Sequence, residues 1–119
     1  MTLQIELVAA DRVVWSGEAS EVIVRTIDGD LGVLTGHAPL LSVLVPGVVQ
    51  IRQESGDAVK AAVGDGFISV AGDRVSILAE DAFLATEIDE AAARADLEKA
   101  GDDEAAAALA DAKLRAVSK

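Results

Sequence analysis

The chain has 119 residues, with ten basic and 21 acidic side chains, so its formal net charge is −11. Such a charge argues against direct contact with nucleic-acid phosphates or an anionic lipid surface, and it favours a basic protein partner. Because there is no cysteine, disulfides, thiol nucleophiles and zinc–thiolate sites are excluded. The length predicts one domain, or one domain with a small appendage.

The N-terminal sequence does not have the form of a signal peptide. Residues 1–7 lack a basic start followed by an apolar run. Apolar stretches throughout the chain are far shorter than the roughly 18–20 residues that a membrane helix needs. We therefore expect a cytoplasmic location.

Residues 1–86 are predicted to form a β-sandwich domain. Leu3, Ile5 and Leu7 alternate with polar residues, a period of two that is typical of strands with one buried face. Turn signals separate similar runs at short intervals, and segments 50–54 and 58–63 flank a Ser-Gly-Asp loop in the manner of a hairpin. The pattern predicts roughly eight to ten short strands, arranged as an antiparallel sandwich or flattened barrel.

Residues 87–119 are predicted to form an antiparallel pair of helices. Segments 89–100 and 103–117 are rich in alanine and contain neither glycine nor proline. We expect Asp89 to cap the first helix, Gly101 to end it, and Asp102 to cap the second. The second helix is predicted to pack through a narrow stripe of small residues: Ala105, Ala108, Leu109, Ala112 and Ala116. Such a stripe buries little area, so the pair should be held weakly.

His37 is the single histidine, and it lies in a loop between two strand-like runs. It could serve as a general base, but neither a serine nucleophile motif nor a second histidine supports that role. We therefore expect a turn histidine that bonds backbone or contacts a partner. Gly29–Gly32 superficially resembles a phosphate loop but lacks the Gly-Lys-Ser/Thr ending. The sequence predicts no metal site and no cofactor.

A series of segments then points to a known family. The chain carries Trp-Ser-Gly-Glu, Asp-Leu-Gly-Val-Leu, Gly-His-Ala-Pro-Leu-Leu, Val-Pro-Gly and Gly-Phe-Ile-Ser-Val in this order at residues 15–18, 30–34, 36–41, 45–47 and 66–70, followed by Ile-Asp-Glu-Ala at 88–91. In order and spacing the series resembles the epsilon subunit of the bacterial F-type ATP synthase, called delta in mitochondria. The resemblance covers nearly the whole chain and implies a flattened β-sandwich followed by two antiparallel helices.

The resemblance also implies a function. The chain would be a non-catalytic rotor subunit of the central stalk, linking the gamma subunit to the c-ring and coupling proton flow to ATP synthesis. It would lie peripherally at the cytoplasmic face of the cell membrane. The helical pair would be a regulatory arm that restrains ATP hydrolysis by swinging up along gamma toward the alpha and beta catalytic subunits.

The resemblance assigns residues to two sites. A c-ring contact is expected at one end of the sandwich, formed by Asp30, Gly32, Gly36, His37, Ala38, Pro39, Leu40 and Leu41. Nucleotide-binding members of the family resemble Ile/Leu-Asp-x-x-Arg-Ala, whereas Asp89 and Arg94 are five residues apart here. On a helix this spacing separates the two side chains by about 140° rather than about 60°. We therefore expect weak or absent ATP binding.

Two further hypotheses come from other classes of protein. The glycine-rich loops are compatible with a free-standing β-sandwich module that binds a small ligand or peptide. His37 is compatible with a small hydrolase. Co-purification with a gamma-type partner separates the rotor from the free module, and turnover that is lost in His37→Ala would indicate the hydrolase.

Overall fold

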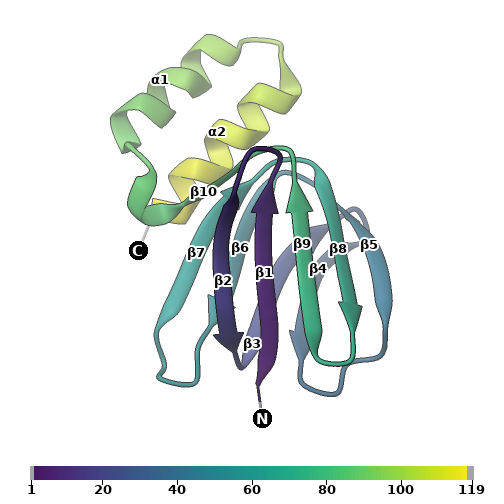
Figure 1. Ribbon diagram of the computed structural model, residues 1–119. Coiled ribbons are helices and arrows are strands. Elements are labelled where there is room, and N and C mark those ends of the chain that lie inside the picture. The colour runs from purple at the N-terminus through teal and green to yellow at the C-terminus, as the bar shows by residue number, and fades with distance from the viewer. Residues whose placement is uncertain (1, 118–119) are drawn as a thin grey trace.

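The computed structural model describes residues 2–117, so Met1 and residues 118–119 of the two predicted regions lie outside the described residues. Ten strands come first within this part of the chain, and helices follow (Figure 1). The strands are β1 (Leu3–Ala9), β2 (Val13–Ala19), β3 (Glu21–Thr26), β4 (Gly29–Leu34), β5 (Leu40–Leu44), β6 (Gly47–Arg52), β7 (Ala58–Val63), β8 (Gly66–Ala71), β9 (Arg74–Ala79) and β10 (Ala82–Leu84). A 3-10 turn, η1 (Ala85–Glu87), leads to α1 (Glu90–Ala100) and α2 (Glu104–Val117).

The strands form a sandwich of two layers. One layer has the order β5-β8-β9-β1-β2, and the other has the order β10-β7-β6-β3, with β4 added on β3. A single bridge between Thr26 and Leu44 joins the layers through β3 and β5. The predicted β-sandwich is therefore confirmed. Its pairs are antiparallel apart from β1 and β9, which run parallel.

The core lies between the layers and follows the predicted alternation. Leu3, Ile5 and Leu7 of β1 are fully or almost fully buried, and the polar residues between them are exposed. Inward-facing residues of the other strands complete one continuous cluster, with Leu44, Ile51, Ile68 and Ile77 among its largest members. In the first part of β1 the alternation thus fixes which face of the strand is inside.

The helical pair also forms, with one correction to its caps. Asp89 caps α1 as predicted, since its Oδ1 accepts a hydrogen bond from Ala92 N at 3.2 Å. Gly101 ends α1 with φ +53°, a conformation that glycine tolerates best. The cap of α2 is Asp103, not Asp102, because Asp103 Oδ1 accepts from Ala106 N at 3.1 Å. Asp102 and Asp103 are adjacent acids of equal capping propensity, so composition could not choose between them.

The arm, residues 90–117, packs against the outer face of β6 and β7 through α2. Ala112 and Ala116 are buried against Ala62 of β7, so these two members of the predicted stripe are confirmed as packing residues. Ala105 is exposed, because the first turn of α2 projects beyond the sandwich. Lys113 adds a polar contact, with its Nζ 4.4 Å from the centre of the Phe83 ring and 3.9 Å from Asp96 Oδ2.

An ion pair stabilises η1, the hinge between the sandwich and the arm. Arg12, in the β1–β2 turn, donates to both carboxylate oxygens of Glu87 in η1 at 2.9 and 2.8 Å, and to Ala82 O at 3.3 Å. Hydrogen bonding from Arg12, with help from Leu84 N, lowers the pKa of Glu87 below its ordinary value. The hinge therefore leaves the sandwich in a fixed direction.

Candidate functional site

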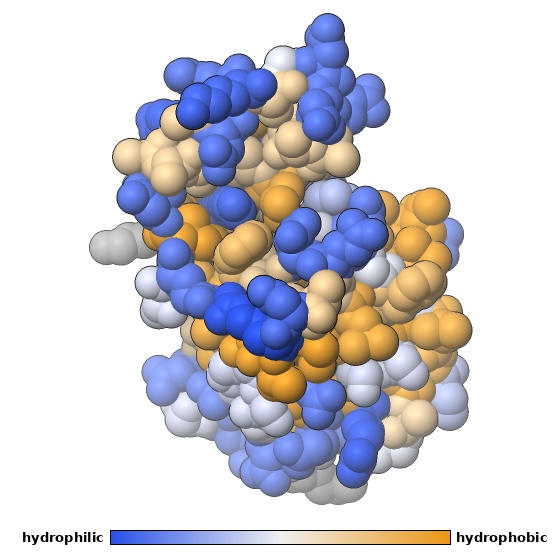
Figure 2. All heavy atoms as spheres, turned by 45° about the horizontal axis from the view of Figure 1, so that its top comes forward, coloured by the Kyte–Doolittle hydropathy of each residue, from blue (hydrophilic) through white to orange (hydrophobic). Residues whose placement is uncertain are grey.

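The layer formed by β5, β8, β9, β1 and β2 carries a row of apolar side chains on its outer face, which we call the apolar face. Val43, Phe67, Leu78, Val8 and Val13 are direct cross-strand partners in that order across β5, β8, β9, β1 and β2. Phe67 is 52% exposed and Leu78 51% exposed, and Val13 and Val43 are also exposed. Figure 2 shows hydrophobic residues gathered on the side of the sandwich that carries β5 and β8.

These strands have apolar residues on both faces. Leu44, Ile68, Ile77 and Leu7 point into the core, and each stands next in sequence to a member of the apolar face. Neighbouring strands lie about 4.8 Å apart, so a row over five strands is about 19 Å long. A contiguous apolar surface of this kind marks an interaction site rather than a surface in permanent contact with water.

A loop lies at one end of this layer, and we call residues 35–39 the contact loop. Gly36 N donates to Asp73 Oδ1 at 2.7 Å, and His37 N donates to Leu34 O at 3.2 Å. His37 Nδ1 lies 2.7 Å from Ala38 O, so this residue is a turn histidine bonded to backbone, as predicted. Leu41, just beyond the loop, is 72% exposed on the same outer face as Phe67.

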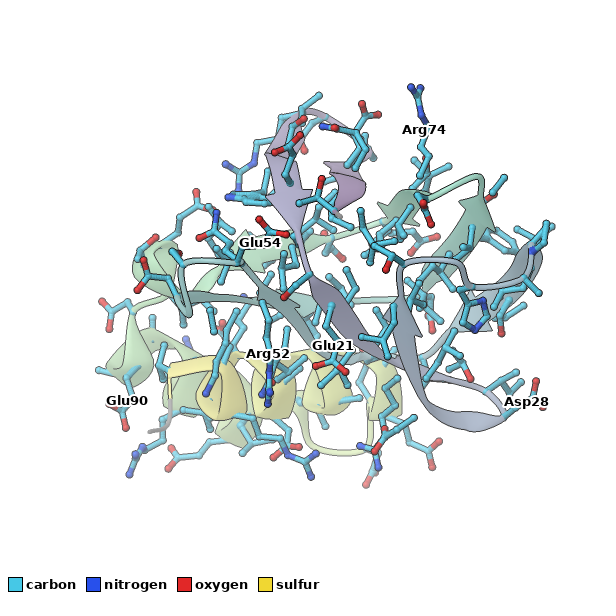
Figure 3. All side chains as sticks on the ribbon, turned by 90° about the horizontal axis from the view of Figure 1, so that it is seen from below. Glu21, Asp28, Arg52, Glu54, Arg74 and Glu90 are labelled. Atoms are coloured by element: carbon cyan, nitrogen blue, oxygen red, sulfur yellow. The ribbon has the colours of Figure 1, made fainter. Side chains whose placement is uncertain are left out.

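The structure does not bring all the predicted c-ring contacts to one end of the sandwich. Asp30 lies at the start of β4 beside the β3–β4 turn, whereas the contact loop follows the last residue of β4. Six residues of extended strand separate opposite ends by roughly 17–20 Å. Figure 3 shows Asp28 at the tip of the β3–β4 hairpin. Gly32 lies between the two ends, exposed in the middle of β4.

The contact loop and the acidic β3–β4 turn are therefore two surfaces. Asp30 is exposed over 78% of its side chain and is only 3.9 Å from Arg25 Nε, a long and weak ion pair. The loop residues Gly36, Ala38 and Pro39 are exposed, while Leu40 packs partly against the core. A single flat partner cannot contact both surfaces end-on.

The two predicted nucleotide residues have other roles. Asp89 caps α1, and Arg94 Nη2 pairs with Glu90 Oε1 at 3.0 Å. Both border a shallow hollow that also contains Glu90 and Glu98, so three carboxylates face one guanidinium. Three negative charges beside one positive charge give the hollow a net negative charge.

Between residues 2 and 117, no three His, Asp or Glu side chains lie together in a way that could hold a metal ion. Over the same range, no helix combines the length and apolar character needed to cross a membrane.

Our sequence reasoning missed the apolar face. Its signal is present as pairs of adjacent apolar residues that break the alternation: Leu7-Val8, Val43-Leu44, Phe67-Ile68 and Ile77-Leu78. A strand with two apolar faces must be covered on both. The second cover is absent from this chain within the described residues, which indicates a partner.

Comparisons with a family model and with individual relatives agree with one another on the family of this chain. Residues 2–85 match the family described as the ATP synthase delta/epsilon chain, beta-sandwich domain. The chain is 58% identical over 118 residues to the ATP synthase epsilon chain of Streptomyces griseus, covering 98% of this chain and 95% of that one. Identity to the ATP synthase epsilon chain of Corynebacterium diphtheriae is 47% over 116 residues, covering 97% and 93% of the two chains.

Solved structures share the fold. A chain in the Euglena gracilis mitochondrial ATP synthase (OSCP/F1/c-ring, rotational state 1) is similar with a TM-score of 0.75 and 26% identity, over 95% of this chain and 75% of that chain. A chain in the Tetrahymena thermophila mitochondrial ATP synthase central stalk and c-ring has a TM-score of 0.64 and 20% identity, covering 97% and 92%.

Sandwich, helical arm and sequence similarity together define a β-sandwich subunit of the ATP synthase delta/epsilon class. Bacterial epsilon chains match this chain over nearly the whole length of both sequences. This chain belongs to the family of ATP synthase epsilon chains, the epsilon subunits of the bacterial F-type enzyme.

Proposed function

We propose that this chain is a non-catalytic rotor subunit of the central stalk. It links the gamma subunit to the c-ring, helps to couple proton flow to ATP synthesis, and restrains ATP hydrolysis through the arm. The observation that carries the proposal is the apolar face, an uncovered row of five cross-strand partners on a sandwich whose own core is complete.

The apolar face docks on gamma. Burying aliphatic and aromatic side chains gives a lasting contact that survives rotation under load, because the hydrophobic contribution is proportional to the area removed from water. The contact loop belongs to the same interface, since Leu41, two residues beyond the loop, lies on the same outer face as Phe67. His37 and its neighbours therefore contact gamma at one end of this interface.

The acidic β3–β4 turn docks on the c-ring. Asp28 and Asp30 are exposed at the tip of a hairpin, and the whole chain is strongly acidic. These carboxylates complement ring loops that carry basic side chains, and such charge pairs set orientation more than affinity. This contact places the chain at the cytoplasmic face of the membrane as a peripheral subunit.

The arm provides the regulation. Its docked form is held by small residues and by Lys113, so contacts with gamma or with the alpha and beta subunits can draw it away from the sandwich. Nucleotide does not select between the docked and undocked arm. Asp89 caps α1, Arg94 pairs with Glu90, and the carboxylates beside them give the hollow a negative charge.

Single-cysteine cross-linking in the assembled synthase tests the proposal, and the chain has no native cysteine to interfere. Leu78→Cys should cross-link to gamma, and Asp28→Cys should cross-link to the c-ring. Ser55→Cys, in the exposed loop between β6 and β7, is the matched control and should react with neither. Cross-linking of Leu78→Cys only to catalytic subunits would contradict the docking on gamma.

Co-purification from membranes that contain the assembled synthase distinguishes the rotor subunit from the free-standing module. If the chain is a rotor subunit, a tagged copy recovers gamma from detergent extracts. Recovery of the chain alone, from membranes in which the synthase is intact, would favour the module that binds a small ligand or peptide.

A further inference from the structure

Asp73 connects three separate segments at the end of the sandwich that bears the contact loop. Its main-chain carbonyl accepts a hydrogen bond from Gln4 N at 2.8 Å, at the beginning of β1. Its carboxylate Oδ1 accepts from Gly36 N at 2.7 Å, in the contact loop. Asp73 itself lies in the turn between β8 and β9. The short carboxylate contact joins this turn directly to the loop.

The backbone of Asp73 makes the identity of this residue informative. Gly72 and Asp73 form a two-residue hairpin turn with φ values of +56° and +61°. Both values lie in the left-handed region, which glycine occupies most easily. Asp73 is the sole non-glycine residue with positive φ among those described. Aspartate is one of the few non-glycine residues that adopt this conformation, and here it also brings a carboxylate to the turn.

The Asp73 carboxylate acts on the contact loop. Gly36 has φ +81°, a Cβ added to it would meet no atom within 4 Å, and Gly36 and Ala38 are exposed. An exposed loop with a glycine at its start loses much conformational freedom when it binds. A carboxylate that accepts the Gly36 amide removes part of this freedom before binding, which is how preorganisation raises affinity.

The fixed loop also determines what His37 presents. Ala38 O, 2.7 Å from Nδ1, is a carbonyl oxygen and can only accept, so Nδ1 carries the hydrogen. In the neutral imidazole, Nε2 is then a hydrogen-bond acceptor. The complementary group on a partner is a donor, such as a hydroxyl, an amide or an ammonium, and not a carboxylate.

We propose that Asp73 is a positioning residue for the contact loop, which it holds so that His37 Nε2 accepts a hydrogen bond from a donor on the partner. This inference rests on the proposed function in one respect, namely that the loop contacts gamma. The fixing of the loop itself is a property of the isolated chain, so the two can fail separately.

Two variants at one position test the role of the carboxylate. Asp73→Gly keeps the positive φ and the main-chain acceptor for Gln4 but removes the side chain. Asp73→Asn keeps a side-chain oxygen that can accept from Gly36 N, and asparagine tolerates this backbone conformation. A general effect of mutating the turn would appear in both variants, whereas loss of the acceptor appears only in Asp73→Gly.

The first measurement uses the full isolated chain. Because His37 is the only histidine, the ¹⁵N shifts of its ring report one tautomer without overlap. The expected result is a dominant Nδ1–H form in the native protein and in Asp73→Asn, and a mixture of tautomers in Asp73→Gly. Hydrogen exchange of the Gly36 amide should rise about tenfold in Asp73→Gly. Unchanged tautomer and exchange in Asp73→Gly overturn the proposal.

The second measurement is affinity for the purified gamma subunit. Asp73→Gly should bind about tenfold more weakly, and Asp73→Asn should bind within about threefold of the native chain. If the loop loosens in Asp73→Gly but the affinity does not change, Asp73 still fixes the loop and the contact of the loop with gamma is wrong. Equal loosening in both variants would also overturn the proposal, because the side-chain acceptor would then have no part in it.

Discussion

Replacement of Phe67 by serine tests the apolar face most directly. Phe67 lies in the middle of the row, between Val43 and Leu78, and is 52% exposed in the free chain. A phenylalanine has about 200 Å² of surface, so about 100 Å² remains to be covered by a partner. At about 25 cal/mol per Å², covering this area contributes about 2.5 kcal/mol to binding. Phe67→Ser should therefore weaken binding to gamma about seventyfold.

The same substitution also affects folding, because the other half of the ring is buried against the sheet. By the same area argument, Phe67→Ser should lower the free energy of unfolding by up to about 2 kcal/mol. Affinity can be measured by titration calorimetry with purified gamma, and stability by urea denaturation. Both quantities are needed, since a poorly folded variant would also bind weakly.

Ile27→Ser supplies the matched control. Ile27 is 67% exposed and lies in the β3–β4 turn, outside the apolar face and the contact loop. Its substitution should leave the affinity for gamma unchanged. Equal loss of affinity in the two variants would refute the reasoning, because binding would then follow stability and not the apolar face.

Five further outcomes are expected. Gly66→Ala should lower the free energy of unfolding by about 3 kcal/mol in urea denaturation, because a Cβ there collides with the Leu78 carbonyl oxygen and lies 2.7 Å from Ala79 Cα. Gly32→Ala, with its nearest neighbour at 3.9 Å, should change it by less than about 0.5 kcal/mol. Glu87→Gln should be less stable than the native chain at pH 7; the pKa of Glu87 is lowered, so the difference shrinks as pH falls below 4.5. A chain ending at residue 87 should unfold cooperatively in urea, and loss of cooperativity would contradict this expectation. The full chain should show no micromolar ATP binding by calorimetry, with or without magnesium.

The fold could be predicted from the sequence because burial imposes a simple pattern on it. Leu3, Ile5 and Leu7 alternate with polar residues, and such a run has one solution, a strand with one face in a core. The pairing of β1 with β9 could not be predicted. A strand of period two looks the same whether its neighbour is parallel or antiparallel, and nearly the whole sandwich lies between these two strands in sequence.

The site was less predictable, for a reason that also lies in strand geometry. Asp30 and His37 are seven residues apart, and a motif that spans both suggests one surface. Because β4 lies between them as an extended strand, they come to opposite ends of the sandwich. The apolar face escaped prediction because its members come from five strands and are adjacent only in the folded sheet.

The arm and the apolar face differ in what holds them, and the difference bears on regulation. The docked arm buries three alanine side chains, Ala62, Ala112 and Ala116, with Val48 and Ile88 partly buried beside them, and Lys113 lies over Phe83. Each alanine methyl group contributes about 0.8 kcal/mol and the cation–π contact about 0.5–1 kcal/mol, so small terms set the equilibrium between the docked and undocked arm. Moving that equilibrium to the opposite extreme requires a differential affinity of about 5.5 kcal/mol. On the proposed function, we expect a helix partner in the assembled synthase to supply this by burying a few leucine-sized side chains, and we expect no such effect from a nucleotide that faces three carboxylates. We therefore predict that the arm responds to protein contacts, while the apolar face keeps the sandwich attached to gamma.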